Sequence, residues 1–381
     1  MIYAYSFQNK KRDLSDILST VVKDEPRFIS LFGKKANANA QKHEWLEDQI
    51  AGRSVAVNGA VSALACPMSA GDLAKLKVGT LVTVKGDSAL FRVNAVATDK
   101  ATLALVAANG SKKTTPAEGD ILNIVSTPMS EGTSNGDGED TARKVGTDYN
   151  CTQIFRKEIV LSGSAIATAV YGNVDNNLNR QTAFAMQELS RDLNRVALFG
   201  RRVEAAGAVN GEAGGLYFFG TQNGGLSIDA GAAAFDSYIV NDGAQAIQSE
   251  GGAPGIILCS PGQARVLTAE FKERMQILRT DDRLGAYVAV IVNEINGRGM
   301  TIMADPDVPD CDAWIIDPVG FGLANLKGRE MSDEDATPKG FDGIKRVALG
   351  ELTFEFKNAK QRLCRISNLK DSAEALAAIR G

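Results

Sequence analysis

A single histidine, His43, would have to serve any catalytic site that pairs a base with a serine or cysteine nucleophile. It stands at the start of a predicted strand, and we interpret it as a structural or exposed side chain. Five cysteines are scattered along the chain: Cys66, Cys151, Cys259, Cys311 and Cys364. None of them forms a CxxC pair, so the sequence predicts neither a zinc site of several His or Cys ligands nor a disulfide framework. We interpret them as buried free thiols in a reducing cytoplasm.

Two clusters of acidic residues have the composition, but not the spacing, of a metal or acid–base site. The run SNGDGED at 134–140 lacks helical flanks and the glutamate that ends a calcium loop, so we interpret it as a solvated loop. Asp305, Asp307, Asp310 and Asp312 alternate with two prolines, which is typical of a rigid loop. No phosphate-binding loop of the form GxxxxGK[ST] occurs either. The sequence therefore predicts no metal, no cofactor and no catalytic residue.

The bulk composition describes an ordinary globular chain of 381 residues, of which 44% are hydrophobic and 23% are charged. That length predicts two or three domains, or one domain with large insertions. Because the formal net charge is −4, contact with nucleic acid would need local basic patches. The N-terminus lacks the apolar core of a signal peptide, and no run of 18 apolar residues occurs. We therefore expect synthesis in the cytoplasm and no membrane partner.

Residues 1–45 are predicted to form an extended arm with one short helix. Apolar side chains recur at helical spacing after Asp13 and appear again beyond Pro26. This apolar surface has no obvious partner nearby in the sequence, so we expect it to bury against neighbouring copies of the chain. The candidate contact residues of the arm are Leu14, Ile17, Phe28, Leu31 and Phe32.

A long β-hairpin is predicted in which a strand at 43–57 pairs with a return strand at 147–162. The return strand alternates with period two, so apolar and polar residues fall on opposite faces. Polar residues such as Asn150 and Thr152 are expected on the face opposite Tyr149 and Phe155. The apolar face of a projecting hairpin needs a partner, and we expect neighbouring copies to provide it. The candidate contact residues of the hairpin are Trp45, Tyr149 and Phe155.

An insertion is predicted within the hairpin region, which extends over residues 46–162. Short β segments separated by glycine-containing turns predict a small all-β domain at 66–126. The acidic and glycine-rich residues that follow predict a flexible linker at 127–146.

The remaining chain combines a long helix with an α/β region. The strongest helical pattern covers 174–200, within a segment at 163–230 that ends in a glycine-rich stretch. Alternating helices and buried strands are predicted over 231–340. Two more strands and a short terminal helix are predicted within 341–381. The pattern as a whole predicts an α+β fold.

This order of parts resembles the major capsid proteins of tailed bacteriophages, whose fold is shared with herpesvirus capsids and encapsulins. The motifs that carry the resemblance include RDLSDI at 12–17, HEWL at 43–46 and YNCTQIFRKEIVLSG at 149–163. The helical segment at 185–200 and the sequence GELT at 350–353 also fit. The match extends in order over nearly the whole chain.

The resemblance implies a name for each part of the chain. Residues 1–45 would be the N-terminal arm, and 46–162 the extended loop that carries the inserted β domain. Residues 163–230 would form a peripheral domain with a spine helix, and 231–340 an axial domain. Residues 341–381 would return to the peripheral domain.

The resemblance also implies a structural protein of the virion capsid that is not an enzyme. Such a chain assembles with itself into pentamers and hexamers of an icosahedral shell, and the shell packages double-stranded DNA without sequence specificity. Separate scaffolding, portal and decoration proteins are further implied partners. Two alternatives stay open: an encapsulin-like compartment subunit, and a ligand-binding protein or enzyme with an accessory β module. Deleting residues 1–33 is expected to abolish shells and to leave a folded core.

Overall fold

The computed structural model describes most of the chain as two compact units, one formed by residues 48–145 and the other by the rest of the chain. The described residues are 26–33, 37–48, 54–111, 114–129, 145–168, 177–222, 225–271 and 290–380. Leu14 and Ile17 of the arm lie outside them, and so does the acidic run at 134–140. In the described ranges, no helix is both long and apolar enough to cross a membrane.

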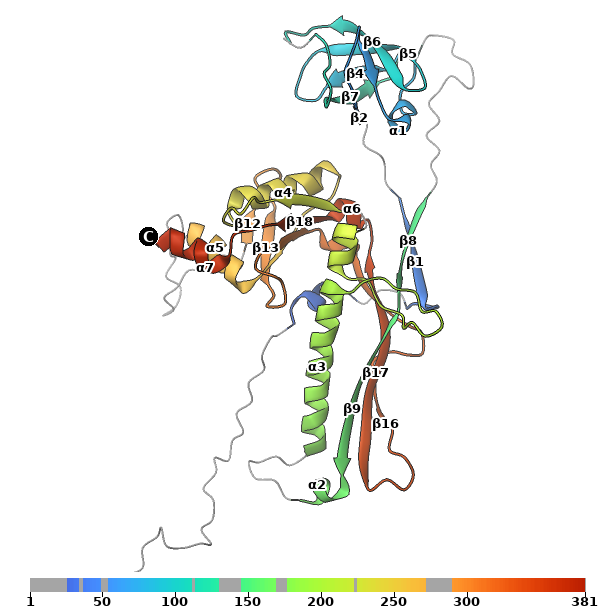
Figure 1. The fold of residues 1–381 in the computed structure, drawn as a ribbon, viewed down its shortest axis with the longest axis vertical. Coiled ribbons are helices and arrows are strands. Elements are labelled where there is room, and N and C mark those ends of the chain that lie inside the picture. Colours follow the sequence, from blue (N-terminus) through green and yellow to red (C-terminus); the bar gives the residue numbers. More distant parts are fainter. Residues whose placement is uncertain are drawn as a thin grey trace, which may run out of the picture. The chain divides into compact units, whose positions relative to one another are not determined.

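The smaller unit is an antiparallel barrel-like sheet with the strand order β2-β7-β4-β5-β6-β3 (Figure 1). Its elements are β2 (Ser54–Ala56), β3 (Ala65–Pro67), α1 (Ala70–Leu73), β4 (Leu81–Val84), β5 (Leu90–Val96), β6 (Lys100–Ala107) and β7 (Ile121–Ser126). Alternate residues such as Val82, Phe91 and Leu122 point inward and are fully buried. The amide of Asn58 donates to the carbonyl of Pro67 at 2.9 Å, which links the two edges of the sheet.

This unit extends further toward the N-terminus than the predicted β domain at 66–126. β2 pairs with β7 along the register Val55 to Leu122, so the chain before residue 66 supplies an edge strand. The prediction of one strand at 43–57 is therefore wrong. Its first half is β1 (Lys42–Glu47) in the larger unit, and its second half is β2 in the smaller one.

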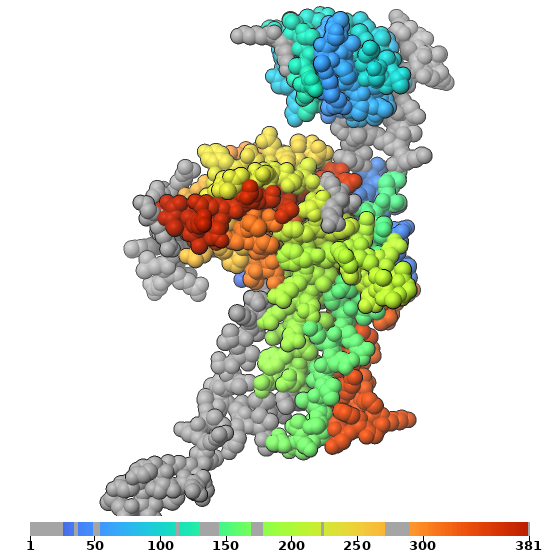
Figure 2. Space-filling model, in the orientation of Figure 1, coloured from blue at the N-terminus to red at the C-terminus, as the bar shows by residue number. Residues whose placement is uncertain are grey.

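The larger unit contains a four-stranded sheet built around the long strand β17 (Gly343–Phe356). Its other strands are β9 (Gln153–Ser162), β15 (Phe321–Asn325) and β16 (Ser332–Asp335), all antiparallel to β17. Helix α3 (Asn177–Phe199) runs beside β9 and occupies the range in which the sequence predicts a long helix. The two elements lie side by side (Figures 1 and 2) and share an apolar core that includes Leu189 and Phe155. Lys157 on β9 pairs with Asp192 on α3 at 2.7 Å.

The predicted return strand at 147–162 is two strands, which change partner at Thr152. β8 (Gly146–Cys151) pairs with β1, whereas β9 pairs with β17. Asn150 and Thr152, which the alternating pattern places on the polar face, are 0% and 5% exposed. Both are buried because other parts of the chain satisfy their hydrogen bonds.

A six-stranded mixed sheet with the order β10-β18-β14-β11-β13-β12 forms the α/β part of the larger unit. Its strands are β10 (Leu226–Asp229), β11 (Ile256–Cys259), β12 (Val290–Val292), β13 (Gly299–Ala304), β14 (Ala313–Ile316) and β18 (Leu363–Ser367). The helices of this region are α4 (Ser237–Ser249), α5 (Pro261–Phe271), α6 (Ala359–Arg362) and α7 (Ser372–Arg380). Helix α2 (Gly163–Ala167) instead follows β9 and contacts the sheet around β17. Because β18 is a central strand here, the C-terminal segment belongs to both sheets rather than only to the sheet around β17.

The glycine-rich stretch between α3 and β10 allows two close backbone approaches. A Cβ atom on Gly215 would lie 2.4 Å from the carbonyl oxygen of Val196, and one on Gly220 would lie 2.3 Å from the Trp314 ring. Glycine at these positions therefore lets the turn after α3, including the short π-helix η3 (Phe218–Gln222), pack directly on the helix and on β14.

Candidate assembly surfaces and their anchors

A buried carboxylate anchors the N-terminal arm where the arm meets α3. Asp305 is 0% exposed, and its Oδ2 accepts hydrogen bonds from the amides of Arg27 (3.1 Å) and Phe28 (2.9 Å). These amides lie at the start of the short 3-10 helix η2 (Phe28–Leu31), where they have no partner within the helix. Asn194 on α3 donates to Asp305 at 3.1 Å and accepts from the amide of Ile29 at 3.0 Å. The arm is therefore fixed by its backbone, whatever its side chains contact.

The four aspartates of the loop at 305–312 each have a structural role. Asp307 accepts a hydrogen bond from Arg195 of α3 at 2.9 Å. Asp310 accepts from Ser260, which caps α5, and from the amide of Ser372 at the start of α7. Asp312 accepts two bonds from Arg365, at 3.1 and 2.8 Å, and one from Tyr217. These contacts agree with the interpretation of a rigid loop.

The apolar residues of the arm are buried in the core of their own chain. Phe28 and Phe32 are 0% and 8% exposed, and their ring centroids lie 5.2 Å apart. Phe32 also packs against Phe321, Phe354 and Phe356 at 5.2 to 5.5 Å. Leu31 is half-buried at the edge of the same core. The expectation that this part of the arm lacks a partner in its own chain is therefore wrong: the partners come from the C-terminal half.

One buried amide side chain holds the base of the hairpin in place. Asn150 on β8 donates through Nδ2 to the carbonyls of Gly214 (3.0 Å) and Phe354 (2.8 Å). Its Oδ1 accepts from the amides of Gly214 (2.7 Å) and Cys151 (2.9 Å). All the hydrogen-bonding capacity of the side chain is used, so Asn150 joins the hairpin, the turn after α3 and β17 at one point.

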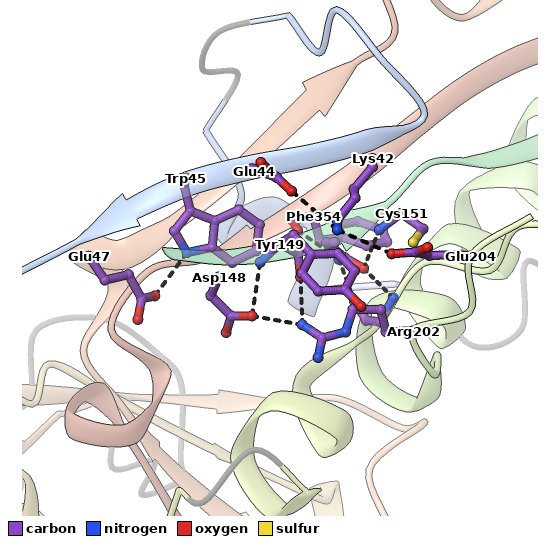
Figure 3. A network of polar contacts seen from close by, with 12 residues as sticks. Lys42, Glu44, Trp45, Glu47, Asp148, Tyr149, Cys151, Arg202, Glu204 and Phe354 are labelled. Carbon is purple, nitrogen blue, oxygen red and sulfur yellow. Dashed lines mark hydrogen bonds and ion pairs between the residues drawn. The ribbon is translucent and has the colours of Figure 1, made fainter. Parts of the chain in front are cut away.

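Tyr149 is held on the other side of the same strand, between two cations. The Lys42 ammonium lies 4.1 Å from the ring centroid and the Arg202 guanidinium lies 4.0 Å from it, on either side of the ring (Figure 3). Arg202 also donates to Asp148 Oδ1 at 2.7 Å and to the carbonyl of Tyr149 at 2.8 Å. Lys42 pairs with Glu204 at 3.4 Å. This network stabilises the hairpin base through cation–π and ionic contacts.

The other candidate contact residues of the hairpin are likewise covered by their own chain. Trp45 and Phe155 are each 5% exposed, and the Trp45 ring lies 6.0 Å from that of Phe219. Trp45 Nε1 donates to Glu47 at 2.8 Å. Phe28, Phe32, Trp45 and Phe155 are therefore buried within their own chain, and Tyr149 and Leu31 are half-buried. A role for any of them in contacts with neighbouring copies stays a prediction.

The structure identifies different apolar residues that are available to a neighbour. Leu46, Ile154, Val160 and Ile166 are 72%, 52%, 53% and 45% exposed. Leu46 on β1 and Ile154 and Val160 on β9 alternate with buried residues, so they occupy the opposite face from the core. Ile166 lies on α2. The signal was present in the sequence, because β9 has apolar residues on both faces. A strand with apolar residues on both faces is typically covered on both sides.

A groove of about 1000 Å³ lies between the hairpin base and the loop at 204–212. Its lining includes Lys42, Cys151, Gln153 and Glu351. Burial raises the pKa of the Cys151 thiol, which keeps it protonated and weakly nucleophilic. In the part of the chain that the structure describes, no group of three His, Cys, Asp or Glu side chains is arranged to hold a metal ion.

Two buried glutamates line the side of β17 that faces the hairpin. Glu351 accepts a hydrogen bond from Thr152 at 2.6 Å. Glu355 is 3% exposed, lies 2.7 Å from Nε2 of His43 and pairs with Lys357 at 3.0 Å. Burial by itself would raise the pKa of Glu355, but the hydrogen bonds from His43 and Lys357 and their positive charges lower it from 4.5 to about 2.

This lowered pKa predicts a specific loss of stability in acid. A carboxylate with a depressed folded-state pKa stabilises the fold above pH 4.5, and this contribution is lost as the pH falls from 4.5 toward 2. The difference in unfolding free energy between the natural chain and Glu355→Gln is expected to shrink by about 3 kcal/mol between pH 6 and pH 2. Urea unfolding followed by tryptophan fluorescence at several pH values measures it. An equal difference at both ends of this range would contradict the prediction.

The fold and its anchors define a class of protein. A long helix beside a strand ribbon, an anchored arm, a hairpin and an α/β domain together form the fold of tailed-phage capsid subunits. The chain resembles the cyanophage A-1(L) capsid subunit with a TM-score of 0.58 and 12% identity, over 97% of this chain and 100% of that one. The capsid subunit of a native GTA particle matches with a TM-score of 0.54 and 9% identity, over 96% of this chain and 97% of that one. A chain of Microbacterium phage Oxtober96 matches with a TM-score of 0.50 and 11% identity, over 94% of this chain and 95% of that one.

The family is narrower than this fold. The model of the SU10 major capsid protein family matches residues 2–370, and the chain belongs to that family. No curated protein sequence matches the chain. The resemblance to phage major capsid proteins predicted from the sequence motifs is thus confirmed, together with the fold that it implied.

Proposed function

We propose that copies of this chain assemble into the pentamers and hexamers of an icosahedral shell that encloses double-stranded DNA, and that the chain has no catalytic role. Membership of a major capsid protein family is the observation that carries the proposal. DNA would be held by local positive charge without reading its sequence, because the net charge of the chain is −4.

The exposed apolar residues of the hairpin base and of β9 support contact between copies. Leu46, Ile154 and Val160 project from rigid strands on the side away from the core, so they need no rearrangement to meet a neighbour. The anchors at Asp305 and Asn150 hold the arm and the hairpin at fixed positions on the larger unit. A rigid subunit loses little conformational entropy on assembly, which favours a regular shell.

The structure changes the design of the arm deletion. Removing residues 1–33 would also remove Phe28 and Phe32, and each buried aromatic ring contributes about 3–5 kcal/mol to folding. A deletion of residues 1–25 leaves η2 and its anchor intact. It is expected to abolish shells while the thermal unfolding midpoint stays within about 2 °C of that of the full chain. Size-exclusion chromatography with negative-stain microscopy measures assembly.

The full-length chain is the control, and it should form closed particles or free pentamers and hexamers. Nuclease treatment followed by extraction then tests whether the particles protect DNA. Full-length chain that stays monomeric under all ionic conditions would contradict the assembly proposal. Particles that contain only protein cargo would contradict DNA packaging and favour a compartment. Saturable small-ligand binding by monomers would favour the alternative of a binding protein or enzyme.

A further inference from the structure

The hairpin meets one face of β17 through polar contacts, while Trp45 of β1 packs in the apolar core. On one face of β17, Leu352, Phe354 and Phe356 belong to the apolar core. On the other face, Glu351, Thr353 and Glu355 are 2%, 0% and 3% exposed. This second face meets the base of the hairpin through the Thr152 and His43 hydrogen bonds. The buried Thr353 hydroxyl has no hydrogen-bond partner among the residues that the structure describes, so part of the seat is unsatisfied.

His43 is the side chain of β1 that reaches into this seat. Its side chain is 14% exposed, and Nε2 lies 2.7 Å from Oε1 of Glu355. A histidine ordinarily gains or loses its proton between pH 5 and 8. Because the pKa of Glu355 is about 2, this carboxylate stays ionised over that whole interval. The contact is therefore an ion pair when His43 is protonated and a neutral-to-charged hydrogen bond when it is not.

The surroundings of the pair favour this dependence on His43. Lys357, which follows β17, pairs with the other oxygen of Glu355 at 3.0 Å. Glu47, at the end of β1, is engaged by Trp45 and by the amide of Asn358 at 2.7 Å. On β8, the residue opposite His43 is Asn150, which is uncharged. Lys42 and Glu44 alternate with His43 along β1 and form an ion pair with each other at 3.2 Å.

We propose that His43 and Glu355 form a protonation-controlled latch that sets how firmly the β1–β8 hairpin is seated on β17. Protonated His43 donates to the carboxylate across a contact that is largely shielded from water, which strengthens the bond. Loss of that proton leaves a polar seat with an unsatisfied hydroxyl and a weaker bond. The base of the hairpin then opens more often, while the apolar core on the other face of β17 is unchanged.

Hydrogen exchange on the unassembled full chain tests the latch. After correction for the intrinsic effect of pH, amide exchange in residues 42–47 and 146–151 is expected to be about fivefold faster at pH 8.5 than at pH 5.5. Strands β4 and β5 of the smaller unit provide an internal reference that should not change. Both latch residues belong to one chain, so the result does not depend on whether shells form.

Two variants and one matched control decide the outcome. His43→Gln retains a neutral donor, so it should exchange at one rate across this pH range, close to that of the natural chain at pH 8.5. Glu355→Gln removes the charge from the partner and should also lose the pH dependence. Lys42→Gln removes a charge from the neighbouring position of the same strand and should keep it. A natural chain whose rates differ by less than twofold, or a His43→Gln variant that keeps the fivefold change, would overturn the proposal.

Discussion

Replacing Asn150 by alanine is expected to lower the free energy of unfolding of the larger unit by about 4 kcal/mol. The substitution leaves the amide and carbonyl of Gly214 and the carbonyl of Phe354 without the partner that Asn150 provides, in a site with 0% exposure. A buried polar group without a partner costs about 1–3 kcal/mol, and these three groups belong to two segments of the chain, the turn after α3 and β17. Urea unfolding monitored by Trp45 and Trp314, which both lie in the larger unit, measures the change.

A matched substitution separates this effect from the loss of an asparagine in general. Asn210 is exposed, so Asn210→Ala should change stability by no more than about 0.5 kcal/mol. Asn150→Asp keeps an acceptor for the two amides but removes both donors, so it should remain strongly destabilising. If Asn150→Ala costs less than 1 kcal/mol, the hairpin base must be held by other contacts, such as the cations around Tyr149.

Asp305→Ala is expected to release the arm from α3 and to destabilise the chain by about 3 kcal/mol. The carboxylate binds the amides of Arg27 and Phe28, and it also accepts from the side chain of Asn194. Without it, these buried donors lose their acceptor and η2 loses the cap on its first amides. Once the backbone is free, the Phe28 ring should leave its pocket. The loss of structure should therefore be confined to the arm.

Limited trypsin digestion detects this release directly. The bond between Arg27 and Phe28 lies at the anchor, so its cleavage should accelerate at least about tenfold in Asp305→Ala. Cleavage after Arg298, in the exposed turn between β12 and β13, should keep its rate and serves as the internal control. Asp305→Asn retains one acceptor oxygen and should give an intermediate rate. Equal protection of Arg27 in the natural chain and in Asp305→Ala would show that the aromatic core alone fixes the arm.

The two anchors also show how far sequence reasoning reached. Period two correctly indicated strands around Tyr149 and Phe155, and the helical pattern correctly indicated the long helix α3. The aspartates near residue 305 were correctly interpreted as a structural loop. Neither pattern indicated that Asn150 or Asp305 would be buried, since a polar residue is expected at the surface until its partner is known.

The largest error concerned the aromatic residues of the arm. Phe28 and Phe32 have no apolar partner within their own segment, which suggested contact with another copy. Their partners are Phe321, Phe354 and Phe356, which are about 290 to 325 residues away in the chain. A local pattern records that a side chain must be buried, but it carries no information about which distant segment covers it.

By itself, the sequence determined the class of this protein. Ordered motifs along the whole chain indicated a phage major capsid protein, and local periodicity indicated its helix, its strands and its inserted β domain. Only the tertiary structure decided which strands pair, that the chain changes partner at Thr152, and which apolar face remains exposed. The physical reason is that periodicity reflects the local backbone, whereas pairing and burial depend on contacts between segments far apart in the chain. The residues that remain free to meet a neighbour, including Ile154 and Val160, could be identified only after those contacts were known.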